Sequence, residues 1–226
     1  MKYNNVLKGT FLSRPNRFIA LVEIDGTIEN CHVKNTGRCK ELLIPGANVY
    51  LEKSDKPERK TKFDLICVEK GGILINMDSQ APNKVFYEWA KMGDYFKNLT
   101  LIKPECKYKN SRFDFYIEAN GEKIFVEVKG VTLEENGILM FPDAPTERGV
   151  KHINELSDAV KNGYRGCIFF VAQMKPCKYF TPNQKTHPEF ANALRKAAKA
   201  GVEVRCVNCR VSPDTLTADS FVDVKL

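Results

Sequence analysis

The stretch that decides the fold of this chain is Arg112-Phe113-Asp114-Phe115-Tyr116-Ile117-Glu118-Ala119-Asn120-Gly121-Glu122-Lys123-Ile124-Phe125-Val126-Glu127-Val128-Lys129. An Asn-Gly pair between two alternating runs is the strongest short signal for a β-hairpin. With Asn120-Gly121 as a two-residue turn, the long apolar side chains of both strands are expected on one face. On the other face Asp114 is predicted opposite Glu127, and Arg112 opposite Lys129. A slip by one residue would scramble both faces, so the pattern itself favours this register.

Asp114 and Glu127 form the predicted chemical centre of the hairpin. Carboxylates directly opposed on paired strands have Cβ atoms about 4.5–5.5 Å apart and repel each other. A divalent cation such as Mg²⁺ or Mn²⁺ offsets that repulsion, and Lys129 adds a positive charge beside it. This arrangement is what metal-assisted hydrolysis of a phosphodiester requires. The alternative is a solvated face on which the acids pair diagonally with Arg112 and Lys129.

A helix is predicted before the hairpin, with Asn83 as its N-cap and its end near Lys97. Glu88 borders the apolar stripe of this helix, where a carboxylate is costly unless it is paired or bound to a cation. The alternative for Glu88 is a rim position that reaches solvent. The stripe itself comprises Val85, Trp89, Met92 and Phe96.

The segments after this helix predict a mixed α/β domain. The expected order is helix, three-strand meander, helix, strand, helix, strand, because the apolar periodicity switches between two and about 3.6 residues. The predicted strands cover residues 112–118, 123–129, 138–141, 167–172 and 202–207, and the later helices cover residues 147–161 and 188–200.

The first part of the chain is predicted to be all-β, with Asp25-Gly26 as a hairpin turn. About five short strands and one small helix over residues 37–43 are typical of a closed barrel of the OB type. A boundary near residues 80–83 gives an OB-like domain over residues 1–81 and a second domain over residues 82–226. The barrel is either a structural appendage or a nucleic-acid platform. The predicted strands cover residues 7–13, 17–24, 27–33, 47–52, 63–69 and 73–76.

Composition narrows the class of partner. The formal net charge of +7 modestly favours a polyanion such as DNA.

No apolar run is long enough to cross a bilayer and no signal core follows the N-terminus, so a cytoplasmic protein without membrane contact is expected. A glycine-rich phosphate loop is missing, so no nucleotide cofactor is expected. The eight cysteines are predicted to be structural thiols, including the isolated pair Cys206 and Cys209.

Asp114, Glu127, Val128 and Lys129, preceded by helical Glu88, resemble the active site of the PD-(D/E)xK nuclease superfamily. Nearly the whole chain resembles the sugar fermentation stimulation protein A (SfsA) family. The matching stretches are Asn35-Thr36-Gly37-Arg38, Leu43-Ile44-Pro45-Gly46, Pro82-Asn83-Lys84-Val85, Ser111-Arg112-Phe113-Asp114-Phe115, Val126-Glu127-Val128-Lys129-Gly130-Val131-Thr132 and Phe141-Pro142-Asp143-Ala144-Pro145-Thr146-Glu147-Arg148-Gly149.

The resemblance implies an N-terminal OB-like β-barrel, a C-terminal PD-(D/E)xK nuclease-like mixed sheet flanked by helices, and DNA binding. It further implies that Asp114 and Glu127 hold Mg²⁺, with the Val128 carbonyl as a third oxygen ligand. Lys129 would act on the attacking water, and Glu88 would be an outer acid.

The segment after residue 141 has two interpretations. Asp143, Thr146 and Arg148 contact phosphate, since helix N-termini and arginine suit anions, or Thr146 is simply an N-cap. His152 lies one turn after Arg148 and either approaches the site or is only packed. Candidate nucleic-acid contacts are Arg112, Arg148, Lys151 and Arg38.

Three functions remain open from the sequence. The leading one is a Mg²⁺-dependent deoxyribonuclease. The second is a DNA-binding regulatory protein on a nuclease scaffold, which the resemblance links to sugar-fermentation genes. The third is a nuclease-like domain that acts on RNA.

Overall fold

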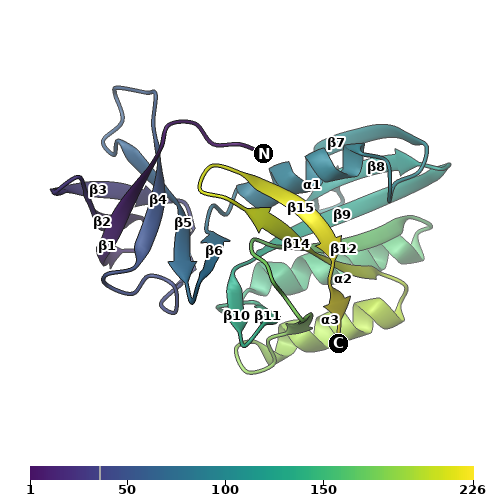
Figure 1. Ribbon diagram of the computed structural model, residues 1–226. Coiled ribbons are helices and arrows are strands. Elements are labelled where there is room, and N and C mark those ends of the chain that lie inside the picture. Colours follow the sequence, from purple (N-terminus) through teal and green to yellow (C-terminus); the bar gives the residue numbers. More distant parts are fainter. Residues whose placement is uncertain (36) are drawn as a thin grey trace.

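The first five strands form the predicted barrel, in a computed structural model that describes residues 1–35 and 37–226 (Figure 1). The sheet order is β3-β2-β1-β4-β5-β6; a parallel pairing of β3 with β5 closes the first five strands, and β6 extends the sheet from β5. Alternate side chains such as Val22, Leu51 and Leu65 fill the interior. The strands are β1 (Val6–Asn16), β2 (Ile19–Ile24), β3 (Thr27–Val33), β4 (Asn48–Lys53), β5 (Phe63–Lys70) and β6 (Ile73–Asn76).

The turns of the barrel agree with the sequence at one place and differ at another. Asp25 and Gly26 both have positive φ, as a two-residue hairpin turn requires. The helix predicted over residues 37–43 is wrong. The amides of Leu42 and Leu43 instead both bond the Cys39 carbonyl in a single turn. Cys39 itself has a φ of 45°, so a helix cannot pass through it.

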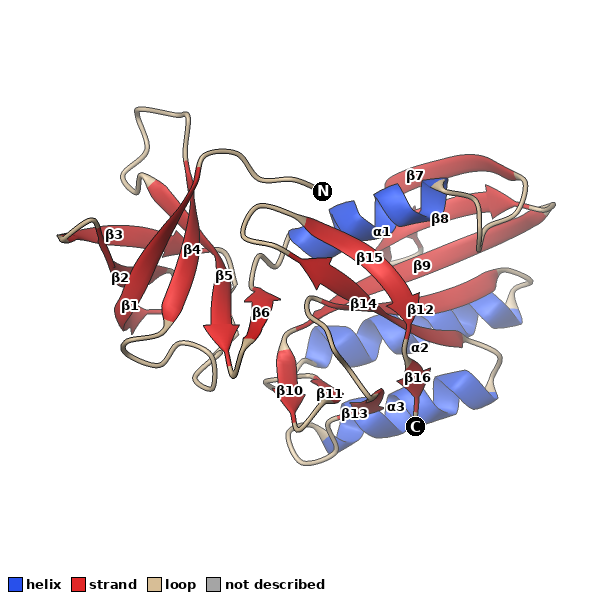
Figure 2. Ribbon diagram, in the orientation of Figure 1, coloured by secondary structure: helices blue, strands red, loops and turns tan. Residues whose placement is uncertain are grey.

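The C-terminal part is built on a mixed sheet with both faces covered. Its order is β15-β14-β12-β9-β8-β7, in which β9, β12 and β14 are parallel. Helix α1 (Ala81–Lys91) covers one face, while α2 (Glu147–Lys161) and α3 (Pro188–Lys199) lie on the other side (Figure 2). The strands are β7 (Leu99–Tyr108), β8 (Ser111–Ala119), β9 (Glu122–Val131), β12 (Arg165–Ala172), β14 (Glu203–Val211) and β15 (Leu216–Phe221).

Two features of this sheet depart from the predicted meander. Residues 138–141 belong to a separate small sheet that comprises β10 (Leu133–Glu135), β11 (Ile138–Phe141), β13 (Tyr179–Pro182) and β16 (Asp223–Val224). The third strand beside β8 is instead β7, which the sequence analysis missed. Lys103, Pro104 and Glu105 interrupt its apolar pattern, as is common on an edge strand that must not pair further.

Helix α1 begins and ends earlier than predicted. Pro82 lies in its first turn, where a missing N–H costs nothing, so Asn83 is inside the helix and not its N-cap. The helix stops at Lys91 because Gly93 turns the chain with a φ of 77°. Met92 is therefore 61% exposed and leaves the predicted stripe, while Phe96 packs from the following loop.

The described residues include no helix that is long and apolar enough to cross a membrane. All eight cysteines are free, and Cys206 and Cys209 are both buried. Burial raises the pKa of Cys209 to about 12. Cys206 and Cys209 pack in two different hydrophobic clusters, which fits the predicted structural role.

Candidate active site

The hairpin of β8 and β9 has the predicted register and then opens. Phe115 pairs with Val126 and Ile117 with Ile124, and both turn residues have positive φ. The ladder stops at Phe115. Asp114 is therefore not directly paired with Glu127 as predicted, and its Oδ2 accepts the N–H of Val128 at 2.8 Å. Beyond this point β9 pairs with β12 and β8 only with β7, so both acids lie at the fork between diverging strands.

The expectation that one face of the hairpin holds all the apolar side chains is also wrong. Phe113 packs with Tyr108 and Phe125 in the larger core, whereas Phe115 packs against Phe86 of α1. The alternation thus breaks at Asp114. Glu105, across from it on β7, has a φ of 52°, which marks an irregularity in the edge strand at the same place. The two-sided burial of the sheet explains why Phe125 is apolar as well.

Glu127 is the most deeply buried acid of the site, with 2% of its surface exposed. Its Oε1 accepts hydrogen bonds from Lys129 Nζ and His152 Nδ1, each at 2.5 Å. Its Oε2 is buried, and no residue that the structure describes donates to it. A carboxylate oxygen in that position is costly unless another donor or a cation satisfies it.

His152 on α2 is held in one tautomer. Arg148 Nε donates to its Nε2 at 3.4 Å, so the proton of the neutral ring lies on Nδ1 and points at Glu127. The ring is 5% exposed. The sequence placed His152 one turn after Arg148 but left its role open, because helical spacing alone does not show which strand the helix covers.

Asp114 is half-buried and has its own two donors. Asn83 Nδ2 reaches Oδ1 at 3.0 Å, beside the bond from Val128. Burial and then the charge of Glu127 raise the pKa of Asp114. Burial opposes the ionisation of Glu127 as well, but the bonds from His152 and Lys129 outweigh it and lower the pKa of Glu127. The site therefore concentrates negative charge, which a bound cation would relieve.

The other predicted residues lie at varying distances from this centre. Glu88 is exposed, and its carboxylate pairs with the Met1 amino group at 2.6 Å, so it has the rim position that reaches solvent. Arg112 pairs with Glu105 at 3.2 Å. Lys151 and Arg38 are exposed, the first on α2 and the second on the barrel.

The carbonyl of Val128, the third predicted ligand, belongs to the same residue whose N–H holds Asp114. Thr146 caps α2 through the Gly149 amide at 3.1 Å, which confirms the N-cap interpretation. The structure thus brings together Asp114, Glu127 and Lys129. Arg148 contacts this group through His152.

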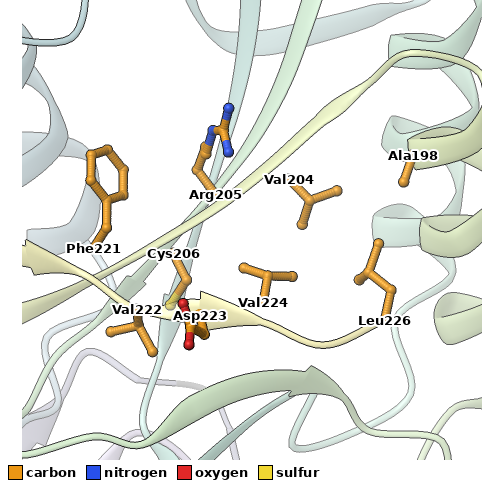
Figure 3. Close-up of a pocket in the computed structure, with 9 residues that line it drawn as sticks. All are labelled: Ala198, Val204, Arg205, Cys206, Phe221, Val222, Asp223, Val224 and Leu226. Atoms are coloured by element: carbon orange, nitrogen blue, oxygen red, sulfur yellow. The ribbon is translucent and has the colours of Figure 1, made fainter.

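Two other places among the described residues lack this chemistry. A hollow of about 400 Å³ lies against α3, β14, β15 and β16, and Figure 3 shows its lining. Asp223 is the one acid among its lining residues, and the Arg205 side chain bonds the Tyr95 hydroxyl.

Among the described residues, one group of three metal-ligand types gathers at Glu147, His187 and Glu189. There His187 Nδ1 accepts the Thr146 N–H at 3.4 Å. The proton of the neutral ring is then on Nε2, which faces Glu147, so this nitrogen is a donor and not a metal ligand.

Comparison with known proteins agrees with this architecture. Residues 80–215 match the family model described as the sugar fermentation stimulation protein RE domain, and residues 12–77 match the SfsA N-terminal OB domain. The chain belongs to the SfsA family. Sugar fermentation stimulation protein homologs from Clostridium beijerinckii and Desulfitobacterium hafniense are 61% and 62% identical to it over 226 residues. The match covers this chain completely in both cases, with 100% and 99% of the respective relatives.

A solved SfsA structure has the same fold over the full chain. SfsA from Pyrococcus furiosus, in complex with Ca²⁺, superposes with a TM-score of 0.90 at 32% sequence identity. The match covers 100% of this chain and 98% of that one. The SfsA fold predicted from the sequence, an OB barrel followed by a mixed sheet with three helices, is therefore confirmed.

Proposed function

We propose that this SfsA-family protein is a divalent-cation-dependent nuclease that hydrolyses phosphodiester bonds in DNA. The observation that carries the proposal is Glu127, whose Oε1 is saturated by two donors while its buried Oε2 has none. Its neighbour Asp114 has a raised pKa because it is buried and close to that charge. Both features suit a site that a cation completes.

The residues that fit a cation are Asp114, Glu127 and the carbonyl of Val128. All three offer hard oxygen ligands, which Mg²⁺, Mn²⁺ and Ca²⁺ prefer. The Ca²⁺ bound by the P. furiosus relative supports a divalent site in this family. When bound, Mg²⁺ or Mn²⁺ would polarise a phosphate oxygen and lower the pKa of a water.

The protein's own side chains orient the site before any substrate arrives. His152 and Lys129 fix one oxygen of Glu127 and leave its other oxygen, Oε2, available to a cation. Asn83 and the Val128 amide hold Asp114 in the same way. Lys129, only 19% exposed at its side chain, keeps a positive charge where negative charge develops on the phosphate.

DNA is the substrate that the charge and the domain arrangement favour. The chain carries a net +7, and neutralised phosphates supply most non-specific affinity for nucleic acids. Arg112, Arg148 and Lys151 are exposed around the fork, and Arg38 is exposed on the barrel. OB barrels commonly bind single strands.

The decisive experiment compares wild type with Lys129→Ala and with Lys123→Ala, an exposed lysine on the same strand. Each protein is incubated with linear duplex, single-stranded and plasmid DNA, and with RNA, in Mg²⁺, Mn²⁺ or EDTA. We expect metal-dependent DNA cleavage by wild type and Lys123→Ala, and at least about 100-fold slower cleavage by Lys129→Ala.

Other outcomes point elsewhere. Equal cleavage by all three proteins would place the activity outside the fork. Salt-sensitive DNA binding without cleavage would show a DNA-binding regulatory protein on a nuclease scaffold. Faster cleavage of RNA than of DNA would assign the site to RNA.

A further inference from the structure

A cavity of about 390 Å³ lies where the barrel meets the carboxyl ends of β9 and β12. The barrel stands beside this end of the sheet in Figure 1, where β10 and β11 follow β9. Asn35 and Gly37 form one wall, Gly130 and Gln173 the floor, and residues 141–146 the opposite wall. Ligands of sheets with parallel strands bind outside the carboxyl ends of those strands, and the volume suits a small organic group.

The wall from the barrel is fixed in place. The guanidinium of Arg14 donates to the carbonyls of Asn35 at 2.7 Å, and of Gly37 and Arg38 at 2.9 Å. A Cβ on Gly37 would collide with the carboxylate of Asp143, so the two walls approach as closely as glycine permits. These two walls are also stretches that carry the SfsA resemblance. Neither wall takes part in the proposed hydrolysis.

Gln173 supplies a polar atom aimed into the cavity. Its Nε2 donates to Asn76 Oδ1 at 2.8 Å and to the Asp78 carbonyl at 3.0 Å, and because both are acceptors the amide can take only this orientation. Its Oε1 therefore lies next to Gly130, 2.5 Å from where a Cβ of that glycine would stand. Gln173 is 1% exposed as a whole residue, and its Oε1 lies at the cavity that Gly130 also lines. An acceptor that is held in one orientation at a cavity suits a donor from a ligand.

The remaining lining selects the kind of ligand. Asp143 adds acceptors and the buried Thr132 adds a hydroxyl, while Phe141, Pro142 and Pro145 present apolar walls. No lysine or arginine lines the cavity in the described residues, so a phosphate group is disfavoured. A planar, uncharged group with N–H donors on its edge matches these walls, and a nucleobase is such a group.

We propose that the cavity receives one nucleobase of the bound strand, turned out of the stack, next to the phosphate at Glu127. The inference rests on the proposed function, because it takes the nucleic acid at the fork as given. Gly130 follows Glu127 by three residues on β9, roughly 10 Å at about 3.3 Å per residue, which a nucleotide beside that phosphate can span. The cavity would then select bases that carry an exocyclic amine.

The test uses short DNA strands with 2-aminopurine at successive positions, because this base fluoresces when it leaves the stack. Binding is followed by anisotropy in Ca²⁺, which replaces Mg²⁺ to keep the DNA intact. We expect the fluorescence to rise at one position with wild type. The rise should fall at least about threefold with Asp143→Ala and with Thr132→Val, and stay unchanged with Asp94→Ala, an exposed aspartate elsewhere.

The outcomes separate this inference from the proposed function. DNA binding by anisotropy with no rise at any position would overturn the base cavity and leave the nuclease proposal standing. A rise that both cavity variants leave intact would also overturn it. If wild type binds no DNA in Ca²⁺, the proposed function itself fails, and this inference fails with it.

Discussion

Asp64 in the barrel and Glu127 in the sheet are both buried carboxylates, yet their surroundings differ. Both oxygens of Asp64 are occupied. Arg59 donates to Oδ1 at 2.7 Å and to Oδ2 at 3.0 Å, and His32 Nδ1 lies 2.9 Å from Oδ1. Lys34 Nζ lies a further 3.5 Å from Oδ2. Burial opposes this charge, but the bonds from Arg59 and His32 outweigh it and lower the pKa of Asp64 to about 2.

Glu127 has donors on one oxygen only, and its second acid, Asp114, lies across the fork with a raised pKa. The two acids therefore differ in how many of their oxygens the protein itself satisfies. A buried acid that the protein satisfies completely contributes to folding. A buried acid that the protein satisfies by half, beside a second acid whose pKa is raised, is a candidate for completion by a bound cation.

The Glu127→Gln variant tests this contrast most strongly, through its rate of DNA cleavage. The amide keeps an acceptor for Lys129 and His152 but loses the charge that a cation needs. We expect the single-turnover cleavage rate to fall by about 10³-fold or more. Because the pKa of Glu127 is also lowered in the fold, a drop in the thermal midpoint should accompany the loss of the charge. Glu122→Gln, the same change at the exposed start of β9, is the control. Full cleavage by Glu127→Gln would remove Glu127 from the chemistry.

Asp64→Asn should show the opposite pattern. The pKa difference between 3.8 and about 2 corresponds to about 2 kcal/mol of unfolding free energy at neutral pH. Because the folded pKa is lowered, this contribution is complete above pH 4 and is lost as the pH falls toward 2. Denaturant unfolding of wild type and variant should therefore differ by about 2 kcal/mol at pH 7 and converge near pH 2. A slower cleavage rate with unchanged stability would contradict the structural assignment.

The sequence predicted the barrel, the register of the hairpin and the acids at its centre, because turn residues and alternation are local signals. It missed β7, whose edge position replaces apolar residues with Lys103 and Pro104. It also missed that Asp114 and Glu127 lie at a fork, because the divergence depends on β12, which pairs with β9 from far along the chain. The contact between His152 and Glu127 has the same cause, since α2 crosses the sheet only in the folded chain.

A smaller effect is expected at His152, which holds one oxygen of Glu127. His152→Leu removes the donor and should weaken Mn²⁺ binding by about 10–100-fold, as loss of a ligand's hydrogen-bond partner typically does. His152→Asn places an amide nitrogen near the position of Nδ1 and should keep the affinity within about threefold of wild type. Isothermal titration measures both. His187→Leu, at the other buried histidine of this domain, is the control.

The two His152 variants also separate orientation from packing. If Leu and Asn weaken Mn²⁺ binding equally, the ring only fills space and Glu127 finds its position without the donor. If neither changes the affinity, Lys129 alone orients the carboxylate.

The smallest expected effect is on DNA binding by the surface of the barrel, whose exposed cations differ from the cations that pair with Asp64. The cations around Asp64 are used within the fold, so any contact of the barrel with DNA falls to exposed side chains such as Arg38. Arg14 donates to the Arg38 carbonyl oxygen at 2.9 Å, which fixes the backbone, while the exposed Arg38 side chain can reach a phosphate.

Arg38→Ala should weaken duplex binding a few-fold and reduce the slope of log K against log salt by about 0.9, the value for one phosphate contact. Arg210→Ala, at an exposed arginine paired with Asp219, should leave the slope unchanged. If Arg38→Ala leaves the slope unchanged as well, this side of the barrel supports the fold alone, and the grip on DNA belongs to the sheet and α2.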